Sequence, residues 1–137
     1  MDINLAITKI LKTLKQFVNK KYISLTDSGD DALYASLFIA KNKGYTKLLI
    51  PDQGGWLSYK KYGKQLGFEI IELKTSLGII NAKDLKQYGA DNGTDNKTTL
   101  LCTSLAGYYQ EQPLKEIATI CASQHILFIL DANNLSD

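Results

Sequence analysis

The chain alternates short apolar runs with longer stretches whose apolar residues have the spacing of amphipathic helices. Two runs, Leu48–Ile50 and Ile126–Leu130, are continuously apolar, as is typical of strands buried on both faces of a parallel sheet. The five predicted strands are Tyr22–Leu25, Lys47–Ile50, Glu69–Leu73, Thr98–Cys102 and Ile126–Leu130. The predicted helices between them are Asp31–Asn42, Trp56–Leu66, Ala82–Tyr88 and Leu114–Ser123. This alternation predicts an α/β fold, with a doubly wound, mainly parallel sheet between two helical layers.

Turn residues agree with this division. Gly44 and Gly67 fall just past predicted helices, where a left-handed C-terminal cap favours glycine. Pro113 directly precedes the last predicted helix, a position that tolerates proline. Among the connections, only Ala90–Lys97 has the composition of a mobile loop.

A separate amphipathic helix is predicted over residues 1–20. Its apolar positions recur at helical spacing, and lysines occupy much of the remaining surface. The apolar positions are Ile3, Ile7, Ile10, Leu14 and Phe17; the lysines are Lys9, Lys12, Lys15 and Lys20. We expect this helix to pack on another part of the protein, while a helix lying on a membrane surface is the alternative. Residues 21–137 then form the rest of a single domain.

Composition narrows the possible classes of protein. Of the 137 residues, 45% are apolar and 22% charged, as in ordinary globular domains, and no apolar run is long enough to span a membrane. The net charge of +2 is too weak and dispersed to indicate a nucleic-acid partner. No signal peptide is visible, and we interpret Cys102 and Cys121 as reduced, buried residues of a cytoplasmic protein. The single histidine, His125, excludes a histidine-based catalytic triad and a multi-histidine metal site.

Candidate chemistry lies where the predicted strands end, because ligands of open parallel sheets bind beyond the carboxyl ends of the strands. Ser28 and Gly29 open a helix after the first predicted strand and could bind an anion, or Ser28 or Asp30 could simply cap that helix. Trp56, the only tryptophan, could stack on a flat ligand or be a core aromatic. Asp131 ends the last strand and could face a cation or cap a turn. All 16 basic residues are lysines, so no arginine fork is available for an anion.

The order of these features resembles the large domain of fold-type-I pyridoxal-phosphate (PLP) enzymes, most closely the nucleotide-sugar aminotransferases, with cysteine desulfurases and related archaeal enzymes as near alternatives. The resemblance runs from about Tyr22 to the end of the chain. The matching features are Ser28-Gly29-x-x-Ala32-Leu33 opening a helix, a strand closing in Pro51, the aromatic Trp56, the strand end Thr103-Ser104, Pro113-Leu114-x-x-Ile117, and a strand ending in Asp131-Ala132.

The resemblance implies a role for each matching position. Ser28 and Gly29, with the amide of Asp30, would hold the PLP phosphate. Trp56, or the backbone around Gly55, would lie at the position of the aromatic that stacks on the pyridine ring. Asp131 would pair with the ring nitrogen and keep it protonated, so that the ring can act as an electron sink. Asn134 falls near the position that faces the cofactor's hydroxyl group.

Three features separate this chain from a complete enzyme of that family. One is that these 137 residues contain neither the family's substrate-carboxylate arginine nor its small C-terminal domain. Asp30 and Asp31 stand where the family has threonine or another small residue, and two carboxylates repel a phosphate dianion. The Schiff-base lysine of the family lies tens of residues beyond the matching aspartate, outside these 137 residues. We therefore expect weak PLP binding and no transamination by this chain alone.

Three functions fit the sequence. The chain could be the cofactor-binding half of an aminotransferase-like enzyme, a degenerate module without catalysis, or an unrelated α/β domain for a nucleotide or small anion. The family's homodimers and the apolar strand Ile126–Leu130 also predict association, as a homodimer or with a second chain carrying the lysine. The association would use Ile3, Ile7, Ile10 and Leu14, or the region of that last strand.

Overall fold

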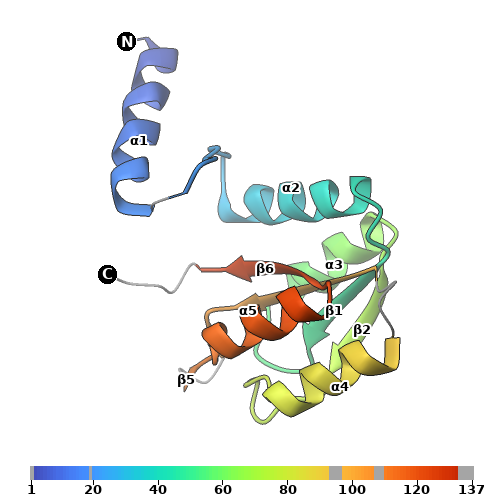
Figure 1. Cartoon of the computed structure of the whole chain (residues 1–137). Helices are drawn as coiled ribbons and strands as arrows, with labels where there is room; N and C mark the ends of the chain where they lie inside the picture. Colours follow the sequence, from blue (N-terminus) through green and yellow to red (C-terminus); the bar gives the residue numbers. More distant parts are fainter. Residues whose placement is uncertain (1, 19, 93–96, 107–109, 133–137) are drawn as a thin grey trace. The chain divides into compact units, whose positions relative to one another are not determined.

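A computed structural model describes residues 2–18, 20–92, 97–106 and 110–132. The chain divides into two compact units, Met1–Ala32 and Leu33–Asp137. The first unit contains helix α1 (Ile3–Val18) and the first turn of helix α2 (Gly29–Asn42); the second contains the rest of α2 and all the strands (Figure 1). No helix in these described ranges is long and apolar enough to cross a membrane.

The second unit is built on a parallel four-stranded sheet with the strand order β2-β1-β3-β6. Its strands are β1 (Lys47–Pro51), β2 (Glu69–Leu73), β3 (Thr98–Thr103) and β6 (Leu127–Asp131). Pro51 pairs with Leu73 and Thr103 with Asp131, so the strands end at one edge of the sheet. Two short strands, β4 (Leu105–Ala106) and β5 (Gln110–Glu111), form an antiparallel pair of their own.

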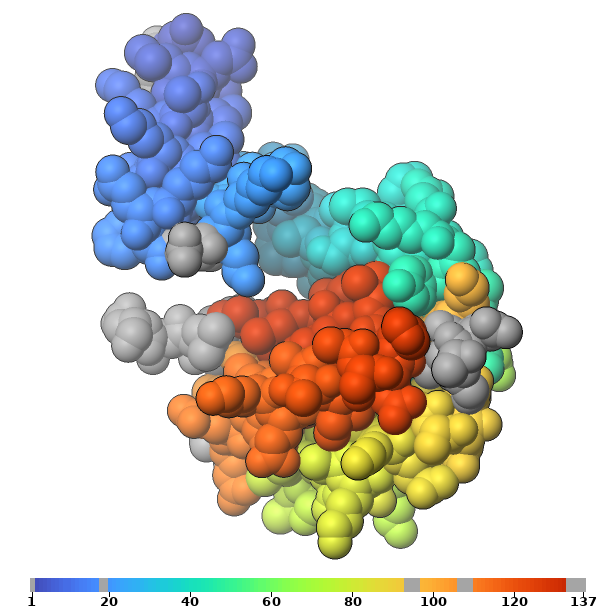
Figure 2. Space-filling view, in the orientation of Figure 1, coloured from blue at the N-terminus to red at the C-terminus, as the bar shows by residue number. Residues whose placement is uncertain are grey.

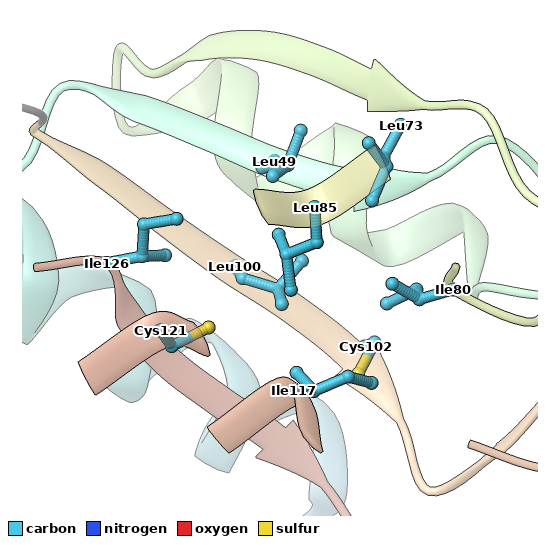
Figure 3. Packing of buried hydrophobic residues seen from close by; sticks show 9 residues of the cluster. All are labelled: Leu49, Leu73, Ile80, Leu85, Leu100, Cys102, Ile117, Cys121 and Ile126. Carbon is cyan, nitrogen blue, oxygen red and sulfur yellow. The ribbon is translucent and has the colours of Figure 1, made fainter. Parts of the chain in front are cut away.

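Helices cover both faces of the sheet, because alternate residues of its central strands point to opposite sides. Leu49 packs in one cluster with Leu85 of α4 (Ala82–Asn92) and Ile117 of α5 (Leu114–Ser123), as Figure 3 shows. The neighbouring Leu48 packs in a second cluster with residues of α2 and of α3 (Leu57–Gln65). Helices α4 and α5 lie side by side, yellow and orange in Figure 2. The predicted three-layer α/β/α fold is therefore confirmed.

Most predicted elements agree with the structure, but three predictions are wrong. Tyr22–Leu25 is not a strand: no described residue pairs with it, and a β-strand requires a hydrogen-bonded neighbour. The predicted loop Ala90–Lys97 begins too early, because α4 continues to Asn92. Strand β6 is only partly buried along its whole length, since it is an edge strand and not a central one.

The backbone and thiol predictions hold. Gly44 and Gly67 have φ values of 96° and 83°, the left-handed conformation expected after a helix. Cys102 of β3 and Cys121 of α5 are free and buried in the cluster between the sheet and helices α4 and α5 (Figure 3). The core is therefore closed by packing between helices and sheet, without a cross-link between these two cysteines.

The approach of α3 to the sheet gives a first prediction. A methyl group at Gly63 would lie 2.6 Å from Ile70 Cδ1 and 2.7 Å from Leu48 Cδ2, so Gly63→Ala forces two core side chains apart. Overpacking of this kind costs about 1–3 kcal/mol, and replacing a glycine inside a helix by alanine returns about 0.5–1 kcal/mol, so we expect a net loss in the free energy of unfolding, measured by urea denaturation. Gly29→Ala is the control, because nothing lies within 4 Å of its added methyl group. Equal stability of the two variants would contradict the close packing.

The buried thiols give a second prediction. Burial raises the pKa of Cys102 and of Cys121 from 9.0 to about 12. Both thiols should therefore resist an aromatic disulfide reagent at neutral pH until the protein unfolds. The folded state holds these protons more tightly than the unfolded state, so this stabilisation is complete below pH 9.0 and falls as the pH rises toward about 12.

Urea denaturation at several alkaline pH values measures that loss. Replacing both cysteines with alanine should remove this part of the pH dependence and serves as the control. Rapid labelling of the native protein at neutral pH would show that the thiols are accessible after all.

Candidate functional site

The carboxyl ends of three neighbouring strands bring the candidate residues of the second unit together. β1 ends at Pro51 and leads through residues 52–56 into α3, while β6 ends at Asp131 beside Thr103 of β3. Because β3 lies between β1 and β6, the loop after β1 and the end of β6 share one edge of the sheet. Parallel α/β sheets bind their ligands at this edge.

Asp131 is held by a tyrosine that the sequence interpretation did not include. The hydroxyl of Tyr59, on α3, donates a hydrogen bond of 2.9 Å to Oδ2 of Asp131. The Tyr59 side chain is 1% exposed, and its burial, followed by the charge of Asp131, raises the pKa of Tyr59 far above its usual range. Tyr59 therefore stays protonated and acts only as a donor to the carboxylate. The other carboxylate oxygen has no partner among the described residues.

The sequence indicates that Tyr59 is buried, but it does not indicate which residue accepts the hydrogen bond from its hydroxyl. Tyr59 and Gly63 lie four residues apart on the buried face of α3, so the tyrosine points into the core. A buried tyrosine hydroxyl needs a hydrogen-bond partner, and few polar side chains occur on the neighbouring strands. Nothing in the sequence indicates that this partner is 72 residues away.

The loop between β1 and α3 is held by hydrogen bonds at its start. Asp52 accepts hydrogen bonds from the backbone amide and the hydroxyl of Thr75, and Gly54 has a φ of 81°. A methyl group at Gly55 would lie 3.2 Å from the Tyr59 ring, so only glycine lets the loop approach that ring freely. The loop thus brings Trp56 to the start of α3 without a side chain between the backbone and Tyr59.

Trp56 lies beside a small hollow at the same edge. Its side chain is 54% exposed, so Trp56 is not a core aromatic. The hollow has a volume of about 140 Å³ and is lined by Gly54, Gly55, Trp56 and Tyr59 among others. Ordinary ligand pockets have volumes of roughly 300–1,000 Å³, so this hollow could enclose only part of a cofactor.

Ser28 forms the cap of α2 in the first unit. Its Oγ accepts a hydrogen bond of 3.1 Å from the amide of Asp31, and its carbonyl accepts one from Ala32. The capping interpretation of Ser28 is therefore confirmed. Among the described residues, the amides of Gly29 and Asp30 have no acceptor, which leaves two donors at the helix N-terminus. The prediction that Ser28 shares one crevice with Trp56 and Asp131 stays a prediction.

Other candidates contribute less. Thr103 and Ser104 are buried, at 4% and 2% exposure, and Thr103 donates to the carbonyl of Leu105. Their hydroxyls therefore do not face a ligand at the surface. Asn134 lies outside the described residues. Within the described ranges, no group of three histidine, cysteine or acidic residues could hold a metal ion.

Comparison with known proteins reveals similarity at the level of structure. No protein-family profile matches the sequence, and no curated protein matches it significantly. A serine palmitoyltransferase from S. paucimobilis, with a bound PLP–myriocin aldimine, matches with a TM-score of 0.70 and 14% identity. The match covers 90% of this chain and 31% of that protein.

Two other solved structures agree. A complex of SepCysS with the N-terminal domain of SepCysE matches with a TM-score of 0.71 and 15% identity, over 90% of this chain and 35% of that one. A sphingosine-1-phosphate lyase from Burkholderia pseudomallei matches with a TM-score of 0.62 and 12% identity. That match covers 75% of this chain and 25% of the lyase chain. The chain therefore has the α/β fold of the large domain of fold-type-I PLP enzymes, and it spans about a third or less of the length of these proteins.

Proposed function

We propose that this chain is the cofactor-binding part of a PLP-dependent enzyme that transfers amino groups. The observation that carries the proposal is the carboxylate of Asp131, which ends β6 and is oriented by the Tyr59 hydroxyl at 2.9 Å. A fixed carboxylate at this edge of the sheet suits a cationic ring nitrogen. The fold of PLP enzymes over 90% of the chain supports the same proposal.

The residues present fit part of the cofactor. Asp131 has one carboxylate oxygen bound by Tyr59 and the other available for a ring nitrogen. The exposed Trp56 offers an aromatic face, and the amides of Gly29 and Asp30, with the Ser28 hydroxyl, are donors for a phosphate. When bound, PLP supplies an electron sink. Tyr59 is then a positioning residue, because it acts on the cofactor only through Asp131.

Other residues limit what the chain does alone. Asp30 and Asp31 lie in the first turn of α2, where their charges stabilise the helix but oppose a phosphate. The lysine that would form a Schiff base comes, in this proposal, from the remainder of the protein or from a second chain. PLP binding by the 137 residues is therefore weak, and transamination by them does not occur.

The same two acidic residues favour a second candidate function. If they exclude the phosphate altogether, the domain keeps the fold of PLP enzymes as a binding module without a cofactor. Tyr59 and Asp131 would then serve stability alone. The two candidates differ in one measurable property, the effect of Asp131 on cofactor affinity.

Pairing with a second chain is the remaining element of the proposal. Among the described residues, β6 has a hydrogen-bonded neighbour on one side only, and all five of its residues are partly exposed. On α2, Tyr34, Phe38 and Ile39 are 39%, 48% and 55% exposed, although a helix that is apolar on most sides is normally covered. These surfaces support association through the region of β6 and α2, with a second copy or with a chain that carries the lysine.

Cofactor binding gives a third prediction. Pyridoxamine 5′-phosphate is the suitable probe because it lacks the aldehyde that would react with the 16 lysines. It should quench the fluorescence of Trp56, the single tryptophan, with a roughly millimolar Kd. Asp131→Asn should weaken binding several-fold, because the amide cannot neutralise a protonated ring nitrogen. Changing both Asp30 and Asp31 to Asn should strengthen it several-fold.

A matched control separates the effects of Asp131, Asp30 and Asp31 on affinity from the effect of a changed net charge. Asp84→Asn also removes an acidic residue from the first turn of a helix, α4, and should leave the affinity unchanged. An affinity that does not depend on Asp131 would favour the module without a cofactor. With PLP itself, a stable aldimine band that one lysine substitution abolishes would contradict the expected inactivity.

Association gives a fourth prediction. Sedimentation at micromolar concentration should give a mass above the 15.2 kDa of one chain. Ile129→Lys, on the edge strand, should shift the protein toward the monomer, whereas Leu57→Lys, at a side chain 90% exposed on α3, should not. A mass near 15.2 kDa at every concentration would rule out association of the chain with itself.

A further inference from the structure

Helix α1 carries an apolar stripe that its own unit leaves open. Ile3, Ile7, Ile10 and Phe17 recur at helical spacing, and their side chains are 72%, 39%, 49% and 82% exposed. Within Met1–Ala32, no described residue of α1 is buried. An apolar stripe of this kind has to be covered by another surface.

The opposite side of α1 is positively charged without compensation. Lys9, Lys12 and Lys15 lie among uncharged polar residues, and α1 contains no acidic residue from Ile3 to Val18. The hydroxyls of Thr8 and Thr13 are uncharged and donate to backbone carbonyls of the helix. Lys20 and Lys21 come next in the sequence after Asn19. The surface that covers the stripe must therefore tolerate, or attract, a row of cations.

We propose that α1 binds flat on an anionic lipid surface. A helix with an apolar stripe on one side and lysines on the other inserts the stripe at the boundary of headgroups and acyl chains, and the lysines contact lipid phosphates. With 16 residues, α1 is about 24 Å long and lies in the surface without crossing it. Such a surface satisfies both sides of the helix at once.

A second copy of α1 is a poorer partner for the stripe. Pairing two stripes brings Lys9 and Lys15 of one helix near the same lysines of the other, and α1 offers no acidic residue to separate them. An anionic membrane removes this repulsion because it supplies the negative charge itself. The sequence led us to expect that α1 docks on another part of the protein. The test must distinguish that docking from binding to a lipid surface.

Vesicle flotation with the full chain tests the proposal. The protein should float with vesicles that contain phosphatidylglycerol and phosphatidylcholine, and bind those of phosphatidylcholine alone at least roughly tenfold more weakly. Molar salt should also weaken binding to the anionic vesicles, by screening the lysines. Ile10→Glu places a charge in the stripe and should abolish binding.

Leu5→Glu is the matched control. Leu5 is four and seven residues before Lys9 and Lys12, so it lies on the lysine side, and it is 53% exposed. This variant adds the same charge outside the stripe and should retain most of the binding. Thermal melting followed by circular dichroism should show both variants folded, because both changes lie outside the second unit, residues 33–137.

Three results would overturn the proposal. One is no flotation of the wild-type chain with anionic vesicles, and another is equal binding to neutral ones. The third is a fall in melting temperature or in sedimenting mass for Ile10→Glu but not for Leu5→Glu. That last result would mean that the stripe is covered by protein.

Discussion

Every residue of β3 is buried, and this constraint organises the second unit. Leu100 and Cys102 pack toward α4 and α5, whereas Leu101 packs in the cluster of α2 and α3. Because alternate side chains of a strand point to opposite faces, neither helical layer can be absent without exposing half of β3. The parallel crossovers then place all four strand ends at one edge, and the candidate residues follow from that position.

The hydrogen bond between Tyr59 and Asp131 joins helix α3 to the end of the edge strand β6. The Tyr59 side chain is part of the core cluster between α3 and the sheet, and Asp131 ends the edge strand. Burial keeps the tyrosine protonated, so its contribution at the sheet edge is a fixed donor. A structural contact within the fold can thereby also set the orientation of a carboxylate that a ligand would use. Stabilising the fold and orienting the carboxylate for a ligand can be distinguished only by their effect on ligand affinity.

Charge is distributed unequally between the surfaces that remain open. α1 has lysines and no acidic residue, whereas the first turn of α2 has Asp30 and Asp31 and no lysine. These two charges stabilise the N-terminus of α2 and would oppose a bound phosphate, so in the proposed function fold stability and cofactor binding compete at the same positions. Similarity to PLP enzymes at 12–15% identity concerns the fold, and positions such as these decide the chemistry.

The sequence alone determined the elements whose signals are local. Strand β2 and helix α5 have the predicted bounds. The spacing of their apolar residues and the glycine or proline that flanks them determine local structure within a few residues. Tyr22–Leu25 failed for the opposite reason: a strand exists only if another strand pairs with it, and that depends on the tertiary structure. The same holds for the partly exposed β6, whose apolar sequence resembles that of a central strand. Asp131 could be named from its place at a strand end, but its partner Tyr59 is 72 residues away, and only the folded sheet brings the two side chains together.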